Sequence, residues 1–173
     1  MAKIELYFPH LLKWEGGYVN DKVDKGGATN MGVTLGTWKN MGYDKNGDSI
    51  INEVDIMLLT KEDALKVLKK GYWDKWEADE ITNQSIAEQL VEWVWGSGIW
   101  GIKLPQRLLK LKEDGVVGPV TLKAINSADP KVLHSQLVAA RLKFVDDIVK
   151  NNSSQSKFIK GWKNRINDFK FSV

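Results

Sequence analysis

The chain has 173 residues, of which 43% are hydrophobic and 27% charged, a balance typical of a globular protein with one domain or one domain and a small appendage. It has no cysteine and two histidines, so a disulfide framework is excluded and a zinc hydrolase, which needs several His or Cys ligands, is disfavoured. No apolar run is long enough to span a membrane, and residues 1–15 carry charges and lack the cleavage site of a signal peptide, so any export route is unknown.

The net charge is +3, and the positive charge is concentrated near the C-terminus. Residues 131–173 contain nine Lys and Arg against three Asp, whereas the preceding residues are net acidic. A basic helix could face an anionic polymer such as cell wall or nucleic acid, or form an ordinary solvated face. Because neither an interleaved aromatic stripe nor a known binding motif accompanies this charge, we expect no nucleic-acid partner.

The first predicted element is a helix, because Ile4, Tyr7 and Leu11 recur at helical spacing. Two glycines end it and leave Glu15 in its last turn. Valines between Gly, Asn and Asp in residues 18–34 then predict a short irregular β-hairpin, followed by a short helix over residues 35–41.

Residues 14–34, WEGGYVNDKVDKGGATNMGVT, combine acidic residues with many glycines and a threonine hydroxyl. Glycines at this density allow tight turns, and such loops often carry function on a rigid scaffold. The motif therefore predicts a site that cleaves sugars, with Glu15 at the helix end and with Asp24 and Thr29 facing it from the hairpin.

Residues 44–55, DKNGDSIINEVD, resemble a calcium loop of the EF-hand or dockerin type. The predicted ligands, at loop positions 1, 3, 5, 7 (a backbone carbonyl), 9 and 12, are Asp44, Asn46, Asp48, Ile50, Asn52 and Asp55. The loop departs from the pattern at position 6, where Ser49 replaces glycine, and at position 12, where Asp replaces the bidentate Glu. The segment predicts a structural Ca²⁺ site, with a polar turn of Asp and Asn residues as the alternative; the chemistry itself requires no cofactor.

The next predicted helices begin at two capping-box patterns. Thr60 with Asp63 starts a helix that runs to about residue 72. Ser85 with Glu88 starts a helix that is apolar on most sides and is therefore expected to be central and buried, ending at Gly98.

Four more helices are predicted after this point. One covers residues 104–111, and a short one starts at residue 120. Asp129 and Pro130 open a long helix to about residue 150, and Ser156 caps a last helix with Phe158 on its buried face. The total is seven or eight helices and one small hairpin, a mainly α class, without a long linker.

Several motifs, in their order, resemble the glycoside hydrolase family 108 N-acetylmuramidases. They are EGGYVND and DKGGATNMGVT, the pair Tyr72 and Trp73, the helix that ends in Gly98, DGVVGPVTL, and the final F-x-x-GWKNR. The family comprises lysozyme-like phage and bacterial proteins, some labelled secretion activator proteins, whose C-terminal part is described as a predicted peptidoglycan-binding domain. The resemblance covers nearly the whole chain and divides it into residues 1–98, the catalytic part, and residues 99–173, a wall-binding part packed on the first.

The resemblance implies a lysozyme-like fold and cleavage of the glycan strand of peptidoglycan, in the cell wall. The family's catalytic glutamate is the one in EGGY, which is Glu15 here. The family often has an Asp and an Asn in the helix that contains VEWVWGSG, where this chain has Glu92 and Gly96. This departure affects the expected substrate contacts.

Glycosidases need a carboxylic acid that protonates the leaving oxygen and a second group that places water or stabilises the cation. Glu15 is the candidate acid, and partial burial beside an aromatic neighbour would favour its protonated form. By likeness to phage-type lysozymes, Asp24 and Thr29 would orient the water in an inverting geometry, with Asp21 as the rival of Asp24. Alternatively, Glu15 is a solvated residue, and Asp24 and Thr29 are ordinary turn residues.

Aromatic residues near this motif are candidates for sugar stacking. The candidate lining of the substrate site consists of Asp21 and three aromatic residues, Tyr18, Tyr72 and Trp73. Alternatively, the three aromatic residues pack in the core. Arg165 is expected to form a structural ion pair or to clamp the fold, with substrate binding as the alternative.

Three function classes stay open. A muramidase produces reducing ends, whereas a lytic transglycosylase shares the fold and the glutamate but produces an anhydro sugar. A non-catalytic wall-binding or secretion-assisting protein would sediment with peptidoglycan and release no new ends. We expect a monomer.

Overall fold

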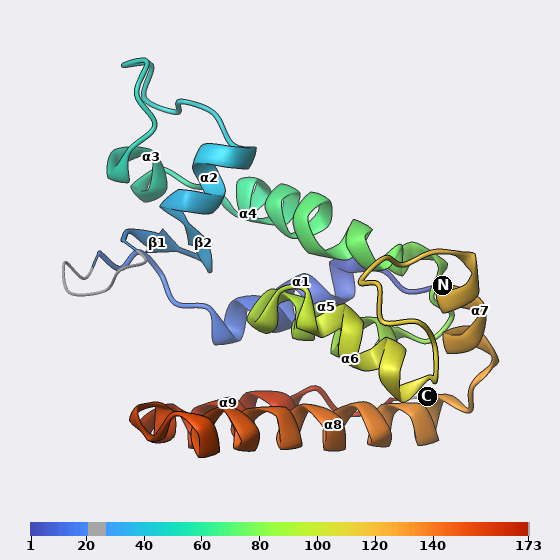
Figure 1. Cartoon of the computed structure of the whole chain (residues 1–173). Helices are drawn as coiled ribbons and strands as arrows, with labels where there is room; N and C mark the ends of the chain where they lie inside the picture. The colour runs from blue at the N-terminus through green and yellow to red at the C-terminus, as the bar shows by residue number, and fades with distance from the viewer. Residues whose placement is uncertain (21–26, 173) are drawn as a thin grey trace. The chain divides into compact units, whose positions relative to one another are not determined.

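The computed structural model describes residues 1–20 and 27–172, which form two compact units (Figure 1). The N-terminal unit is Ile4–Gly71, and the C-terminal unit is Tyr72–Val173 together with Met1–Lys3. The described residues form nine α-helices and one two-stranded antiparallel sheet. This confirms the mainly α class, with one helix more than the upper expectation because the short helix α3 (Glu53–Met57) follows the calcium-loop-like segment.

The N-terminal unit begins with α1 (Ile4–Trp14), whose buried residues Ile4, Tyr7 and Leu11 are those that predicted the helix. They recur every three or four residues, so they share one face of the helix. The backbone N–H of Glu15 still donates to the carbonyl oxygen of Leu11, at 3.1 Å. Glu15 therefore directly follows the last residue of α1.

A tight hairpin follows, made of β1 (Thr29–Asn30) and β2 (Val33–Thr34). Its turn residues Met31 and Gly32 both have positive φ, 49° and 77°, the combination that a two-residue type I′ turn requires. The buried side chain of Asn30 donates from Nδ2 to the carbonyl oxygen of Ile56 on α3, at 2.9 Å. The predicted hairpin is thus present, and a side chain anchors it to α3.

Side-chain caps define the three helices that complete this unit. The hydroxyl of Thr34 accepts from the N–H of Thr37 at the start of α2 (Leu35–Met41). Capping boxes start α3 at Asn52 and α4 (Lys61–Leu68) at Thr60, as predicted for Thr60. Figure 1 shows α2 and α3 beside the hairpin, in agreement with their contacts with β2 and β1.

In the C-terminal unit, α5 (Gln84–Ser97) is the central helix, with nine buried residues. It packs against α6 (Trp100–Leu108) and α8 (Pro130–Asn151), and α8 also packs against α9 (Ile159–Asp168), which lies beside it in Figure 1. Asp129 caps α8 and Pro130 is its first residue, as the sequence predicts. No described helix has both the length and the hydropathy to cross a membrane.

A buried hydrogen-bond network joins three of these helices. Gln89 of α5 is fully buried; its Nε2 donates to the carbonyl oxygen of Phe169 at 2.8 Å, and its Oε1 accepts from Nη1 of Arg141 at 2.6 Å. Because buried polar groups are costly without partners, this network favours one packing of α5, α8 and the end of α9.

The DGVVGP segment forms a turn between α6 and α7 (Pro119–Ser127). Gln106 of α6 holds it, accepting from the N–H of Gly115 at 2.9 Å and donating to Asp114 and to the carbonyl oxygen of Val116. Gly115 has a φ of 75°, a left-handed conformation that favours glycine.

Three predicted helix starts are wrong. Asn83, not Ser85, caps α5; Ser85 is buried, and its hydroxyl accepts from the N–H of Ser172 at 2.9 Å. The last helix begins after Phe158 without a side-chain cap from Ser156, and Phe158 is 45% exposed rather than buried. The helix predicted over residues 104–111 begins four residues earlier, at Trp100.

Candidate functional site

Glu15 is a half-buried residue at the C-terminal end of α1, followed by two exposed glycines. Neither Gly16 nor Gly17 has another heavy atom within 4 Å of the position that a Cβ would take. Side chains at these two positions would therefore meet no neighbouring part of the described structure within that distance.

Backbone hydrogen bonds bring the segment after Glu15 beside the hairpin. Val19 and Thr29 form an antiparallel bridge, each N–H donating to the other's carbonyl oxygen at 2.8 Å. The N–H of Met31 donates to the carbonyl oxygen of Gly16 at 3.1 Å. The segment that follows Glu15 is thus paired by its backbone with the strand that carries Thr29.

The remaining predicted members of this site are placed as follows. Tyr18, the candidate sugar platform, lies on the same segment and is 38% exposed. Asp21 and Asp24 lie outside the described residues, so their positions relative to Glu15 stay predictions.

The calcium-loop-like segment is organised around the carboxylate of Asp44. Its Oδ1 accepts from the N–H of Asn46 and Gly47, at 3.1 and 2.8 Å, and its Oδ2 accepts from the N–H of Ser49 at 2.6 Å. Ser49 has a φ of 70°, so it adopts the left-handed conformation for which calcium loops use glycine at this position. Asp48 accepts in turn from the N–H of Ile50 at 2.8 Å.

The last predicted ligand of the loop, Asp55, is fully buried. Its two oxygens accept from the N–H groups of Lys45 and Asn52, at 2.6 and 2.8 Å, and these bonds lower its pKa, the bond from Asn52 most. Among residues 1–20 and 27–172, no three His, Cys, Asp or Glu side chains gather as a metal site would require. Calcium binding therefore stays a prediction, supported by the shape of the turn and the oxygen side chains.

We expect calcium to raise the melting temperature of the native protein if the loop binds it. A ligand at one hundred times its dissociation constant adds about 2.7 kcal/mol to the free energy of unfolding. Thermal denaturation with EDTA and with millimolar Ca²⁺ checks this, with Asp44→Ala as the comparison. Equal melting temperatures of the native protein under both conditions would show that the loop is a polar turn only.

Tyr72 and Trp73 lie in the C-terminal unit and differ in exposure. Trp73 is fully buried, and its Nε1 donates to Oδ1 of Asp79 at 2.7 Å, a position that favours the core-packing alternative. Tyr72 is half-buried, with its ring centroid 4.6 Å from that of Trp95. Of the pair, only Tyr72 has a partly exposed side chain, and a sugar contact by it stays a prediction.

Glu92, where the family often has Asp, is a buried residue of α5 that forms an ion pair with Arg165 of α9. The structural ion pair predicted for Arg165 is confirmed. Sequence reasoning missed Arg141, which is 6% exposed and lies close to this pair. The signal was present, because Arg141 follows Leu133 and Leu137 at four-residue intervals on the buried face of α8.

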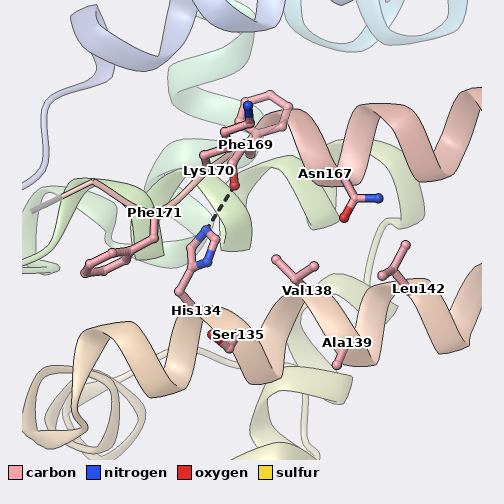
Figure 2. A pocket seen from close by; sticks show the side chains of 9 residues that line it. All are labelled: His134, Ser135, Val138, Ala139, Leu142, Asn167, Phe169, Lys170 and Phe171. Atoms are coloured by element: carbon pink, nitrogen blue, oxygen red, sulfur yellow. Dashed lines mark hydrogen bonds between the residues drawn. The ribbon is translucent and has the colours of Figure 1, made fainter.

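A pocket of about 380 Å³ lies between α8 and the end of α9 (Figure 2). Val138 and Leu142 of α8 contribute to its apolar lining, and the ring of Phe171 lies 5.6 Å from that of His134. Nε2 of His134 is 3.0 Å from the carbonyl oxygen of Phe169, shown as a dashed line in Figure 2. Because a carbonyl oxygen only accepts, Nε2 carries the proton and donates it.

Burial lowers the pKa of His134; the hydrogen bond to Phe169 opposes this shift, and the nearby charge of Arg141 adds to it. The folded state therefore holds His134 neutral at pH values where the unfolded chain, with a histidine pKa of about 6.5, is already binding protons.

We expect the melting temperature to fall as the pH is lowered from about 6.5 to 5, and we expect His134→Gln to make this dependence on pH weaker. Carboxylates whose pKa is lowered in the folded state, such as that of Asp63, reduce the stability of the fold only at lower pH. Melting curves across this range check the prediction, which an equal slope in both proteins would contradict.

Two family models and one solved structure are similar to this chain. Residues 8–98 match the family model described as Glycosyl hydrolase 108, and residues 100–167 match the one described as Predicted Peptidoglycan domain. The solved structure titled "Structure of Brucella abortus SagA" is similar with a TM-score of 0.78 and 30% identity, over 95% of this chain and 90% of that one. None of the curated protein sequences matches significantly. The chain belongs to glycosyl hydrolase family 108, and its match to the predicted peptidoglycan domain follows the match to that family.

Proposed function

We propose that the protein is an N-acetylmuramidase, which hydrolyses the β-1,4 bond after N-acetylmuramic acid in the glycan strands of peptidoglycan. Family membership supports a glycoside hydrolase that acts on the cell wall, and the predicted peptidoglycan domain supports this substrate class. The observation that carries the proposal is the backbone pairing of Val19 with Thr29 and of Gly16 with Met31. It supports the proposal because the segment that follows Glu15 lies beside the strand that carries Thr29.

In this mechanism Glu15 donates its proton to the glycosidic oxygen as the bond to the anomeric carbon breaks. A water molecule attacks that carbon from the opposite face and gives its proton to the carboxylate of Asp24, while Thr29 orients the water. The products are two sugar chains, one with a new reducing end of inverted configuration. Inverting enzymes keep their two carboxyl groups about 6.5–9.5 Å apart to leave room for the water.

Mass spectrometry of purified peptidoglycan after incubation with the native protein tests this proposal. We expect fragments with reducing N-acetylmuramic acid ends. Anhydromuramic ends would assign the protein to the lytic transglycosylases instead. Sedimentation with the wall without any new ends would leave a non-catalytic wall-binding protein, the alternative for which the departures at Glu92 and Gly96 leave room.

A further inference from the structure

A second pocket of the C-terminal unit combines buried charges with an apolar wall. It has a volume of about 210 Å³ and is formed by residues of α5, α8 and α9. Three charged side chains line it: Glu92, Arg141 and Arg165. Two guanidinium groups against one carboxylate give the lining a net positive charge.

These charged groups are held in place by the fold. Arg141 donates to the buried Gln89, and its guanidinium lies 6.0 Å from the ring centroid of Trp93. Arg165 is fixed by its ion pair with Glu92, which is 1% exposed. A guanidinium has five N–H donors in a planar fork, so it can bind a protein acceptor and a ligand carboxylate together. A preorganised arginine loses less side-chain entropy when it binds an anion.

The rest of the lining defines the size and chemistry of the ligand. Val145, Ile148, Trp162 and Ile166 supply apolar surface beside the guanidinium groups. Gly96 leaves its part of the pocket open, because no heavy atom outside its own helix backbone lies within 4 Å of the position of a Cβ there. Pockets for drug-sized ligands span about 300–1,000 Å³, so this smaller one suits a single amino-acid residue.

We propose that this pocket binds a free carboxylate of the peptide stem of peptidoglycan, with the aliphatic part of the same amino acid against the apolar wall. The inference rests on the proposed function for its substrate and adds a peptide subsite to it. A neutral sugar ring would leave the net positive charge of the lining without an anion, whereas a peptide carboxylate matches both the charge and the apolar surface.

The test compares three soluble probes by isothermal titration calorimetry. N-acetylmuramyl-L-alanyl-D-isoglutamine carries one free carboxylate; its amide lacks that charge; triacetylchitotriose is a neutral sugar chain. We expect the carboxylate probe to bind about tenfold or more tightly than its amide, because a charge-assisted hydrogen bond is stronger than a neutral one. We expect no binding of the neutral sugar chain at this pocket.

Gly96→Leu locates the site. The leucine side chain would occupy the open part of the pocket, and replacing a helical glycine favours folding. Gly161→Leu on α9 is the matched control, because Gly161 also has open space around it and does not line the pocket. We expect Gly96→Leu to lose binding of the carboxylate probe and Gly161→Leu to keep it.

Equal binding of the carboxylate probe and its amide, or native-like binding by Gly96→Leu, would overturn the proposal. Release of reducing ends from peptidoglycan is measured in parallel to separate the two hypotheses. Cleavage without carboxylate-dependent binding would reject the peptide subsite and keep the muramidase. Carboxylate-dependent binding that Gly96→Leu abolishes, in a protein that releases no ends, would keep the subsite and reject the enzyme.

Discussion

Glu15→Gln should lower the rate of glycan cleavage about 10³-fold, because general acid catalysis typically contributes 10²–10⁴-fold and glutamine has no proton to donate. Glutamine has nearly the same shape as glutamate, and Glu15 lies at the end of α1 beside two glycines with open space around them. The substitution should therefore leave folding and wall binding unchanged. The measurement is the rate of appearance of reducing ends, with sedimentation on peptidoglycan as the binding assay.

Glu5→Gln is the matched control for this experiment. Glu5 is an exposed residue in the first turn of the same helix, so its substitution removes a carboxylate from α1 at the other end. We expect cleavage at the native rate. A native rate in Glu15→Gln as well would remove Glu15 from the mechanism.

Gly101→Ala should lower the free energy of unfolding by about 3 kcal/mol, at the upper end of the usual cost of overpacking a core. A Cβ on Gly101 would lie 2.4 Å from the backbone nitrogen of Val94 and 2.5 Å from the carbonyl carbon of Trp93. These atoms belong to the central helix α5, so α6 would have to move away from it. The expected drop in melting temperature is about 6–12 °C, by the usual scaling for a chain of this size.

Gly161→Ala provides the control, since it is the same substitution in a helix with open space around it. There the exchange should stabilise the helix by up to about 1 kcal/mol, because glycine is the weaker helix former. Calorimetry of both variants beside the native protein measures the difference. Equal melting temperatures for the two variants would show that α6 shifts at little cost.

The helix caps show which parts of the fold could be predicted from the sequence. Asp129 with Pro130, and Thr60 with Asp63, were predicted correctly because the interactions of a cap span three or four residues. Ser85 with Glu88 shows a similar local pattern, but the helix cap predicted at Ser85 was wrong. Its hydroxyl bonds Ser172, 87 residues away, while Asn83 caps the helix two positions earlier. Local patterns do not report such distant partners.

In the candidate site, too, features that depend on a local motif were predicted, and features that depend on distant residues were not. Glu15 and Thr29 were found from their motif, but the backbone pairing that places their segments together depends on the turn at Met31 and Gly32, which was not predicted. Arg165 was expected to form an ion pair, yet its partner Glu92 lies 73 residues away and no periodicity identifies it. The pocket around Gly96 was not predicted either, since it exists only once three helices have packed.

The hydrogen bond from Asn30 to the carbonyl oxygen of Ile56 gives the calcium-loop-like segment a mechanical role. This bond ties the strand that contains Thr29 to α3, the helix that follows the loop. Any event that melts α3 also releases the side chain that anchors the hairpin, so the two segments should open as one cooperative unit. Shortening the loop would thereby loosen the strand that carries the proposed water-orienting hydroxyl.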